Sequence, residues 1–288
     1  MPIGAIDVSG ASGSSSATFS NSRFASDPTF AAIAGGDTMS VGANSPAVGI
    51  LQAALLDMGF AMRPYTSTSG KKVGGIDNDF GGQTQRGLQN FQRHASHLFP
   101  GIVANGVLDK KTLAALDALA PPPGKQAWSS GQAPAAPNPY FGGDPNKSLR
   151  VVVVKDEHRT YLYDQAGEVS AIFSNSVGKV ASPTHKGLKV VTGKLDQKTA
   201  EQTGIALWKD KKAFGVRIID LSWASGSKSG EELHGTFADN QMGQDVSHGC
   251  VRHYNEDILA LFAALKVGDR VAIVDRIDAP ELGAPINV

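Results

Sequence analysis

The stretch LHGTFADNQMGQDVSHGCVR, from Leu233 to Arg252, holds the residues on which the organisation of this chain depends. It contains Cys250, the one cysteine among 288 residues, and the histidines His234 and His248 precede it. A lone cysteine cannot form an internal disulfide, so nucleophilic chemistry, metal binding or simple packing must account for it. Only nucleophilic chemistry requires a nearby base and exposed backbone amides.

A histidine close to Cys250 would favour the reactive thiolate. A free thiol has a pKa of about 8.5, and a neighbouring imidazolium can lower it to roughly 6. His234 is the candidate for that imidazolium, and Gly249 leaves room for a substrate carbonyl to approach the sulfur. The amides around His248, Gly249 and Cys250 are suited to stabilise the oxygen that becomes negative during acyl transfer. These residues indicate a cysteine acyl-transfer site.

Two simpler explanations stay open on composition alone. A single buried cysteine is usually an inert, small apolar side chain. Three histidines and a cysteine within twenty residues also suggest zinc, but their spacing matches none of the compact zinc motifs, and no metal site is predicted. His253, which follows the motif, is explained equally well as a polar residue where a helix begins.

The sequence HGT followed by SHGCVR resembles the signature of the L,D-transpeptidase catalytic domain, the YkuD-type fold of bacterial cell-wall enzymes. The resemblance implies that Cys250 is the nucleophile and that His234 is the base. It implies that the carbonyl of Gly235 orients this histidine, although many relatives have serine there. It also implies an oxyanion hole made by the backbone amides of His248, Gly249 and Cys250.

The same resemblance implies the substrate and the reaction. Thr236, Ser247 and Arg252 are the expected substrate contacts, and some relatives carry asparagine in place of Arg252. The implied substrate is a peptidoglycan stem tetrapeptide, from which Cys250 displaces the terminal D-alanine to form a thioester. Transfer to an amine gives a cross-link or an exchanged D-amino acid, and transfer to water is L,D-carboxypeptidase activity.

Two other functions fit the same residues. The chain could be an antibacterial effector exported by a type VI-type apparatus, with an immunity protein as a partner and the same chemistry used to trim a competitor's stems. Alternatively, it could be a non-enzymatic protein that only binds the cell wall. Retention of Cys250, His234 and the adjacent glycines argues against the non-enzymatic alternative.

Length and charge restrict the class of protein. A chain of 288 residues is long enough for two modest domains, and its 27 basic residues balance its 27 acidic residues. This balance gives no electrostatic reason to expect nucleic acid or an anionic membrane as a partner. No apolar run approaches the roughly 18 residues of a membrane span. No phosphate loop or dinucleotide fingerprint occurs, so no cofactor is predicted.

Residues 1–43 are rich in Ser, Gly and Ala, and we expect them to form a flexible segment. They contain no basic residue before Arg23 and no continuous apolar core, so they do not read as a secretory signal. The expected place of action is the periplasm or cell wall. It would be reached after removal of a signal or by a route other than the general secretory one.

Apolar spacing predicts three helices after this segment. The first begins at Ser45 and ends at Gly59, the second begins near Gln83, and the third begins at Asp109. The segments IDNDFGGQTQRGLQNFQR and ANGVLDKKTLAAL resemble a peptidoglycan-binding domain, which we place at residues 44–120. This resemblance implies peptidoglycan glycan as a further partner. A Pro/Ala-rich linker is expected at residues 121–147.

The remaining chain reads as a mainly β domain at residues 148–275, with a short tail at residues 276–288. Strands are predicted at residues 151–155, 160–163 and 169–174, and further strands near residues 189–192, 215–221 and 270–274. A helix is expected from Asn255. SVGK and SPTHKG, at residues 176–179 and 182–187, resemble further landmarks of the catalytic domain. The predicted fold class is α+β, a three-helix bundle linked to a YkuD-like domain with a helix after the cysteine.

Overall fold

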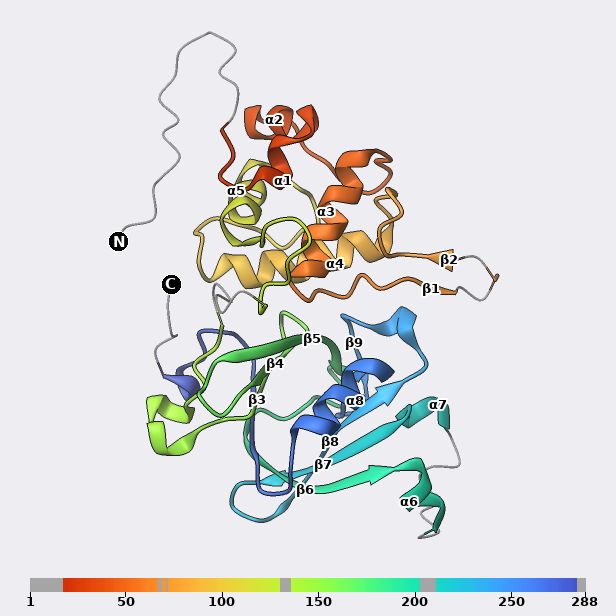
Figure 1. Ribbon diagram of the computed structural model, residues 1–288, viewed down its shortest axis with the longest axis vertical. Coiled ribbons are helices and arrows are strands. Elements are labelled where there is room, and N and C mark those ends of the chain that lie inside the picture. Colours follow the sequence, from red (N-terminus) through yellow and green to blue (C-terminus); the bar gives the residue numbers. More distant parts are fainter. Residues whose placement is uncertain (1–17, 67–68, 71, 130–135, 203–210, 284–288) are drawn as a thin grey trace.

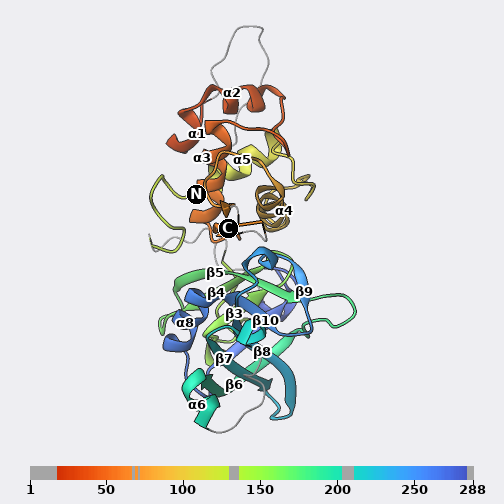
Figure 2. The same ribbon diagram turned by 90° about the vertical axis from the view of Figure 1, so that its right-hand side faces the viewer.

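The computed structural model describes residues 18–66, 69–70, 72–129, 136–202 and 211–283. These residues form a helical N-terminal domain and a sheet-rich C-terminal domain, stacked one above the other (Figures 1 and 2). The structure confirms the predicted mixture of helices and strands, with the helices concentrated in the N-terminal half. Among the described residues, no helix is both long and apolar enough to span a membrane.

The N-terminal domain consists of five helices and a two-stranded hairpin in its described residues. Asp27, Ser45 and Asp109 occupy the N-cap positions of three helices, and the side chains of Asp27 and Asp109 accept hydrogen bonds from backbone amides. The elements are α1 (Ser22–Ala25), α2 (Pro28–Gly35), α3 (Pro46–Asp57), β1 (Tyr65–Thr66), β2 (Lys72–Val73), α4 (Gly82–Ser96) and α5 (Lys110–Leu119).

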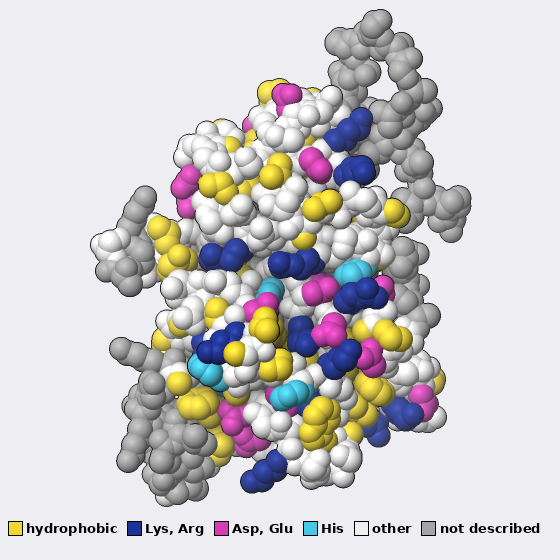
Figure 3. Space-filling model, turned by 180° about the vertical axis from the view of Figure 1, so that it is seen from behind, with side chains coloured by type: hydrophobic (Ala, Val, Ile, Leu, Met, Phe, Trp, Pro, Cys, Tyr) yellow, Lys and Arg dark blue, Asp and Glu magenta, His cyan; other side chains and the backbone are white. Residues whose placement is uncertain are grey.

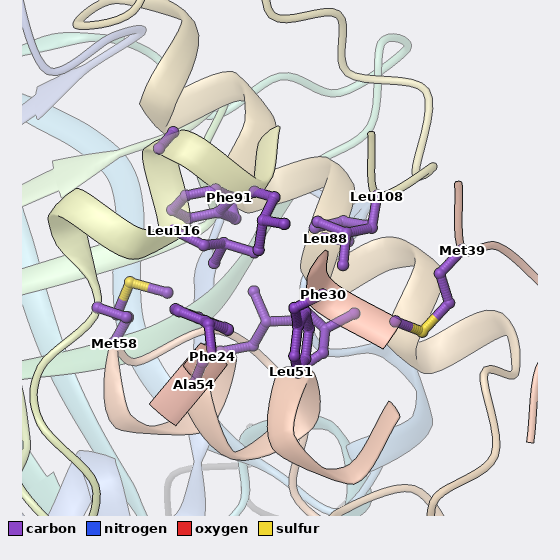
Figure 4. Close-up of a cluster of buried hydrophobic side chains, with 14 of the residues drawn as sticks. Phe24, Phe30, Met39, Leu51, Ala54, Met58, Leu88, Phe91, Leu108 and Leu116 are labelled. Carbon is purple, nitrogen blue, oxygen red and sulfur yellow. The ribbon is translucent and has the colours of Figure 1, made fainter. Parts of the chain in front are cut away.

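The expectation of a flexible segment over residues 1–43 is wrong for its described part. Helices α1 and α2 bury Phe24, Phe30 and Ile33 in the same apolar core as α3, α4 and α5 (Figure 4). Residues far along the chain hold these helices in place. For example, Arg23 of α1 forms an ion pair of 2.6 Å with Asp57 at the end of α3. Residues 1–17 lie outside the described residues.

The C-terminal domain is built on a nine-stranded sheet in the order β10-β8-β7-β6-β11-β3-β4-β5-β9. Strand β10 also pairs with β5, so the two ends of the sheet meet. Its strands are β3 (Val151–Val154), β4 (Arg159–Tyr163), β5 (Val169–Gly178), β6 (Gly187–Asp196), β7 (Arg217–Trp223), β8 (Lys228–Thr236), β9 (Asp245–Ser247), β10 (Val251–Tyr254) and β11 (Arg270–Val274).

Apolar side chains cover both faces of the central strands. All four valines of β3 are buried, as expected for a strand covered on both sides. On one side lies α8 (Asn255–Ala264), whose Ile258 and Leu261 pack into the core of the sheet. Two short helices, α6 (Gln197–Gln202) and α7 (Lys211–Phe214), lie between β6 and β7 along the chain.

The described parts of the predicted linker and tail pack against the domains. The Ala127 amide donates to the Asp57 carbonyl of α3 at 2.9 Å, and the Tyr163 hydroxyl of β4 donates to the Pro137 carbonyl at 2.6 Å. Leu282 is buried in the cluster that also contains Ala127. Residues 121–129 therefore bridge the two domains instead of forming a free tether.

Polar groups join the two domains directly. The Ser174 hydroxyl donates to the Gly59 carbonyl at 2.9 Å, and the Asn90 side chain donates to the Gly243 carbonyl at 3.2 Å. Basic, acidic and histidine side chains gather where the domains meet on the face seen in Figure 3. We call this contact region the domain seam. Its hydrogen bonds restrict the motion of one domain relative to the other, so the helical domain holds a defined position over the sheet.

Candidate active site

Two neighbouring parallel strands bring the motif residues together. Strand β10 pairs with β8 so that Arg252 lies beside His234, and Cys250 directly precedes β10. Since side chains alternate along a strand, Cys250 and Arg252 face the same side of the sheet as Glu232 and His234. The Cys250 thiol accordingly lies within 3.9 Å of Glu232 Oε2.

His234 is held in one orientation and one tautomer. Its Nδ1 donates a hydrogen bond to the Gly235 carbonyl at 2.6 Å, which leaves Nε2 as the nitrogen that can accept a proton. The Phe214 ring lies against the imidazole, with 5.1 Å between the ring centroids. Burial lowers the pKa of His234 to about 4, with a smaller contribution in the same direction from nearby Arg252. His234 is therefore a neutral imidazole at pH 7.

Neighbouring atoms leave no room for a side chain at Gly235. A Cβ atom at this position would lie 2.3 Å from Asn255 Oδ1, which already accepts a hydrogen bond from the Val216 amide at 3.1 Å. The carbonyl of Gly235 is thereby fixed where it accepts from His234. The structure thus places Gly235 in the position expected of a residue that orients the imidazole.

The SHGC turn is held by hydroxyl groups. The Ser247 hydroxyl donates to the Cys250 carbonyl at 2.5 Å and accepts from the Gly249 amide at 3.2 Å. Thr184 Oγ1 donates to the Gly249 carbonyl at 2.7 Å and accepts from the Gly178 amide at 2.8 Å. Gly249 has a φ of 118°, a region that favours glycine. The turn that carries Cys250 is therefore rigid before any ligand binds.

Of the three amides expected in the oxyanion hole, that of Gly249 already donates to Ser247. The amides of His248 and Cys250 are consequently the better candidates for contact with a developing oxyanion. The His248 side chain is exposed, and its Nε2 lies 3.2 Å from Lys179 Nζ. This imidazole therefore lies at the surface beside the turn.

The pKa values of Cys250 and His234 are both shifted in the direction that disfavours an ion pair. Burial, together with the negative charge of Glu232, raises the pKa of Cys250 to about 11. Together with the lowered pKa of His234, this is the opposite of the expected thiolate stabilisation. Both shifts favour the neutral thiol and the neutral imidazole.

The expected substrate contacts divide into two kinds. Thr236 and Ser247 are fully buried, and each hydroxyl is used within the chain, by the Ala238 amide and the Cys250 carbonyl respectively. They shape the site and offer no side chain to a ligand. Arg252 is partly exposed, and its guanidinium donates to Gln241 Oε1 at 2.8 Å.

Two functional positions were not anticipated from the sequence. Glu232 touches the thiol, and Thr184 connects the turn to β5. Alternation along the strand would have put Glu232 on the face of His234, two residues away. Among the described residues, no group of three or more His, Cys, Asp or Glu side chains is arranged to hold a metal ion.

A second concave site lies in the helical domain. A cleft of about 660 Å³ opens between the β1–β2 hairpin, which contributes Tyr65 and Lys72, and the first turns of α4, which contribute Gln83 and Arg86. Gln83 Oε1 and Arg86 Nε are buried atoms without a hydrogen-bond partner among the described residues. Buried polar atoms of this kind are normally satisfied, so these two are exceptions beside the cleft.

Comparison with known proteins gives two family matches. Residues 148–273 match the YkuD family, described as the L,D-transpeptidase catalytic domain. Residues 44–116 match a family described as a putative peptidoglycan binding domain.

Individual proteins are similar over parts of the chain. Two Bacillus proteins are named as putative L,D-transpeptidases. YqjB of B. subtilis is 27% identical over 150 residues, 51% of this chain and 78% of that protein. YkuD of B. licheniformis is 41% identical over 51 residues, 18% of this chain and 31% of that protein. A crystal structure of the L,D-transpeptidase from Xylanimonas cellulosilytica shares 21% identity with a TM-score of 0.43, covering 83% of this chain and 98% of that one.

Proposed function

We propose that this protein modifies peptidoglycan through a thioester on Cys250, because residues 148–273 match the L,D-transpeptidase catalytic domain and residues 44–116 match a putative peptidoglycan binding domain. The observation that carries the proposal is the arrangement on β8 and β10. There a thiol and a neutral imidazole with a free Nε2 stand on one face of the sheet, beside a preformed turn. The proposed substrate is a peptidoglycan stem tetrapeptide with a diamino acid at its third position.

In the first half of the reaction, Cys250 attacks the carbonyl carbon of the third stem residue. His234 Nε2 accepts the thiol proton as the sulfur–carbon bond forms, because neither group is charged at rest. The amides of His248 and Cys250 stabilise the oxyanion. The bond to the terminal residue then breaks, and His234 returns the proton to the departing amine of D-alanine.

In the second half, an acceptor attacks the thioester. His234 accepts a proton from the acceptor, the carbon–sulfur bond breaks, and the proton passes to the sulfur. An amine on another stem gives a cross-link between two third residues, a free D-amino acid gives an exchanged terminus, and water gives a tripeptide. The proposed place of this chemistry is the cell wall or periplasm.

The N-terminal cleft supports the proposal that the helical domain holds the polymer. The polar side chains that line it, among them Tyr65, Lys72 and Arg86, suit the hydroxyl and amide groups of glycan and stems. Binding of the Cys250→Ala protein to purified sacculi should be weakened by Arg86→Ala. Arg276→Ala, which removes an exposed arginine from the other domain, should leave binding unchanged. Equal binding by all three proteins would contradict a role for the cleft.

Defined disaccharide-tetrapeptides test the proposed reaction. The wild-type protein and Cys250→Ala are incubated with them, with and without D-methionine, and the products are identified by mass spectrometry. We expect release of D-alanine by wild type only, together with dimers, tripeptides or methionine-terminated stems that identify the acceptor. Release of D-alanine by Cys250→Ala would contradict the proposed nucleophile, and no release by wild type would contradict the reaction.

A further inference from the structure

The carboxylate of Glu232 is the charged group nearest to the nucleophile that the proposed mechanism does not use. Its Oε2 lies 3.9 Å from Cys250 Sγ, so an acyl group on the sulfur would form beside this carboxylate. An acceptor that attacks the thioester must approach the same carbon. Glu232 is thus placed to contact the acceptor and not only the enzyme.

A second carboxylate extends this negative surface away from the sulfur. Asp220 on β7 is the direct cross-strand partner of Glu232 on β8. On the next strand, Gly193 lies opposite Asp220, and a Cβ atom there would be 2.4 Å from Asp220 Oδ2. The two carboxylates thus form an acidic track, defined as Glu232 and Asp220, that leads from Cys250 toward β6.

Neither carboxylate of the acidic track forms an ion pair with a Lys or Arg side chain that the structure describes. Burial raises the pKa of both carboxyl groups. Glu231 differs, because Lys189 Nζ lies 2.8 Å from it and His185 Nδ1 lies 2.6 Å from it. Like charges placed directly across two strands destabilise a sheet, so the unpaired arrangement needs another reason.

A positively charged acceptor supplies that reason. Both amine acceptors of the proposed reaction, a stem side chain and a free D-amino acid, carry an ammonium group near neutral pH, whereas water carries no charge. We infer that Glu232 selects an amine over water as the acceptor of the acyl group on Cys250, an inference that rests on the proposed function. Asp220 attracts the ammonium group toward Glu232 along the acidic track.

The proton balance of this step is simple. The ammonium group gives one proton to the Glu232 carboxylate and becomes a neutral amine. Its nitrogen attacks the thioester carbonyl, the carbon–nitrogen bond forms, and the carbon–sulfur bond breaks. His234 accepts a second proton from the nitrogen and passes it to the Cys250 sulfur, while Glu232 releases its proton to water. A thioester and an ammonium ion thus give an amide, a thiol and one free proton.

Because Cys250 is the only cysteine, its reaction with charged thiol reagents reports the local potential without any substrate. The full-length protein is treated with a cationic and an anionic methanethiosulfonate, and the ratio of the two rates is measured. Glu232→Gln should lower the cationic-to-anionic ratio roughly tenfold, as expected for one charge removed at close range. Glu232→Asp should keep most of the ratio, and Glu168→Gln, an exposed residue in the turn before β5, should not change it.

The second readout is the partition of the acyl group. With tetrapeptide and D-methionine, the products of Glu232→Gln should show a roughly tenfold lower ratio of exchanged stems to tripeptides at any rate of D-alanine release, with Glu232→Asp restoring the ratio. If Glu232→Gln leaves either the cationic-to-anionic rate ratio or the ratio of exchanged stems to tripeptides unchanged, the inference about Glu232 is wrong, while the proposed function still stands. Absence of D-alanine release by wild type contradicts the proposed function, and the inference with it.

Discussion

Arg63 of the helical domain and Asp257 at the start of α8 form an ion pair of 2.6 Å across the domain seam. The same guanidinium lies 3.1 Å from Glu256 and 4.8 Å from the centre of the Tyr254 ring. Tyr254 ends β10, the strand that begins directly after Cys250. The helical domain is therefore attached to the segment that follows Cys250.

Arg63→Ala should lower the free energy of unfolding by about 2 kcal/mol, because it leaves the buried Asp257 carboxylate without its partner, although Arg63 itself is partly exposed. Urea denaturation measures the change. Arg276→Ala, which breaks an exposed pair with Asp278, is the matched control and should change stability by less than about 0.5 kcal/mol. Equal effects of the two substitutions would show that the seam pair does not fix the domains.

The thiol should titrate at unusually high pH. Burial raises the pKa of Cys250 to about 11, so less thiolate is present at pH 7 than in a free cysteine. Alkylation by iodoacetamide should therefore rise roughly tenfold per pH unit between pH 7 and pH 9, since the thiolate fraction grows in that proportion below the pKa. Free N-acetylcysteine serves as the reference. A rate that already levels off near pH 7 would instead indicate an imidazolium–thiolate pair with His234.

Gly249→Ala should damage the site through its backbone. The φ of Gly249 is 118°, so an alanine at this position carries backbone strain of roughly 1–3 kcal/mol. Its Cβ would not clash, because the Pro183 carbonyl oxygen would lie 3.7 Å away. Gly268→Ala is the control, because Gly268 also has a positive φ and open space around it. Both variants should lose similar stability, but only Gly249→Ala should lose most D-alanine release. Equal release by both would mean that the turn conformation does not matter for the reaction.

Thr184→Val should loosen the turn. It leaves the Gly178 amide and the Gly249 carbonyl without their shared partner, which costs about 2 kcal/mol for buried groups. We expect acyl transfer to slow roughly tenfold or more, because the position of Cys250 depends on this bridge. Thr184→Ser keeps the hydroxyl and should retain the rate. If serine and valine slow the reaction equally, the methyl group and not the hydroxyl is what the site needs.

Local patterns predicted much of the fold but not the strands that carry the site. The apolar spacing of Val48, Leu51 and Leu55 and the β-branched run of β3 placed α3 and β3 correctly. Strands β8, β9 and β10 were not predicted, because their glycines and polar residues become extended through pairing, β8 with β7 and β10 and β9 with β5. Helices α1 and α2 were missed for a similar reason, since Asn21 and Arg23 are held by Asp117 and Asp57.

For the candidate site, the sequence pointed to Cys250, His234 and Gly235, and the structure brings these residues onto adjacent strands. The protonation of the pair could not be read from spacing, because it depends on how deeply both groups are buried. Glu232 was missed because its contact with the thiol depends on the register of β8 against β10. Thr184 was missed because it lies 65 residues from the turn that it holds.

The measurement that tests the central claim most directly is the intact mass of the protein after brief exposure to a disaccharide-tetrapeptide and an acid quench. Wild-type protein should gain the mass of the tetrapeptide less D-alanine, and peptide mapping should place the adduct on Cys250. Cys250→Ala should gain nothing. Release of D-alanine by wild type with no adduct on Cys250, or an equal adduct on Cys250→Ala, would contradict a thioester at this residue.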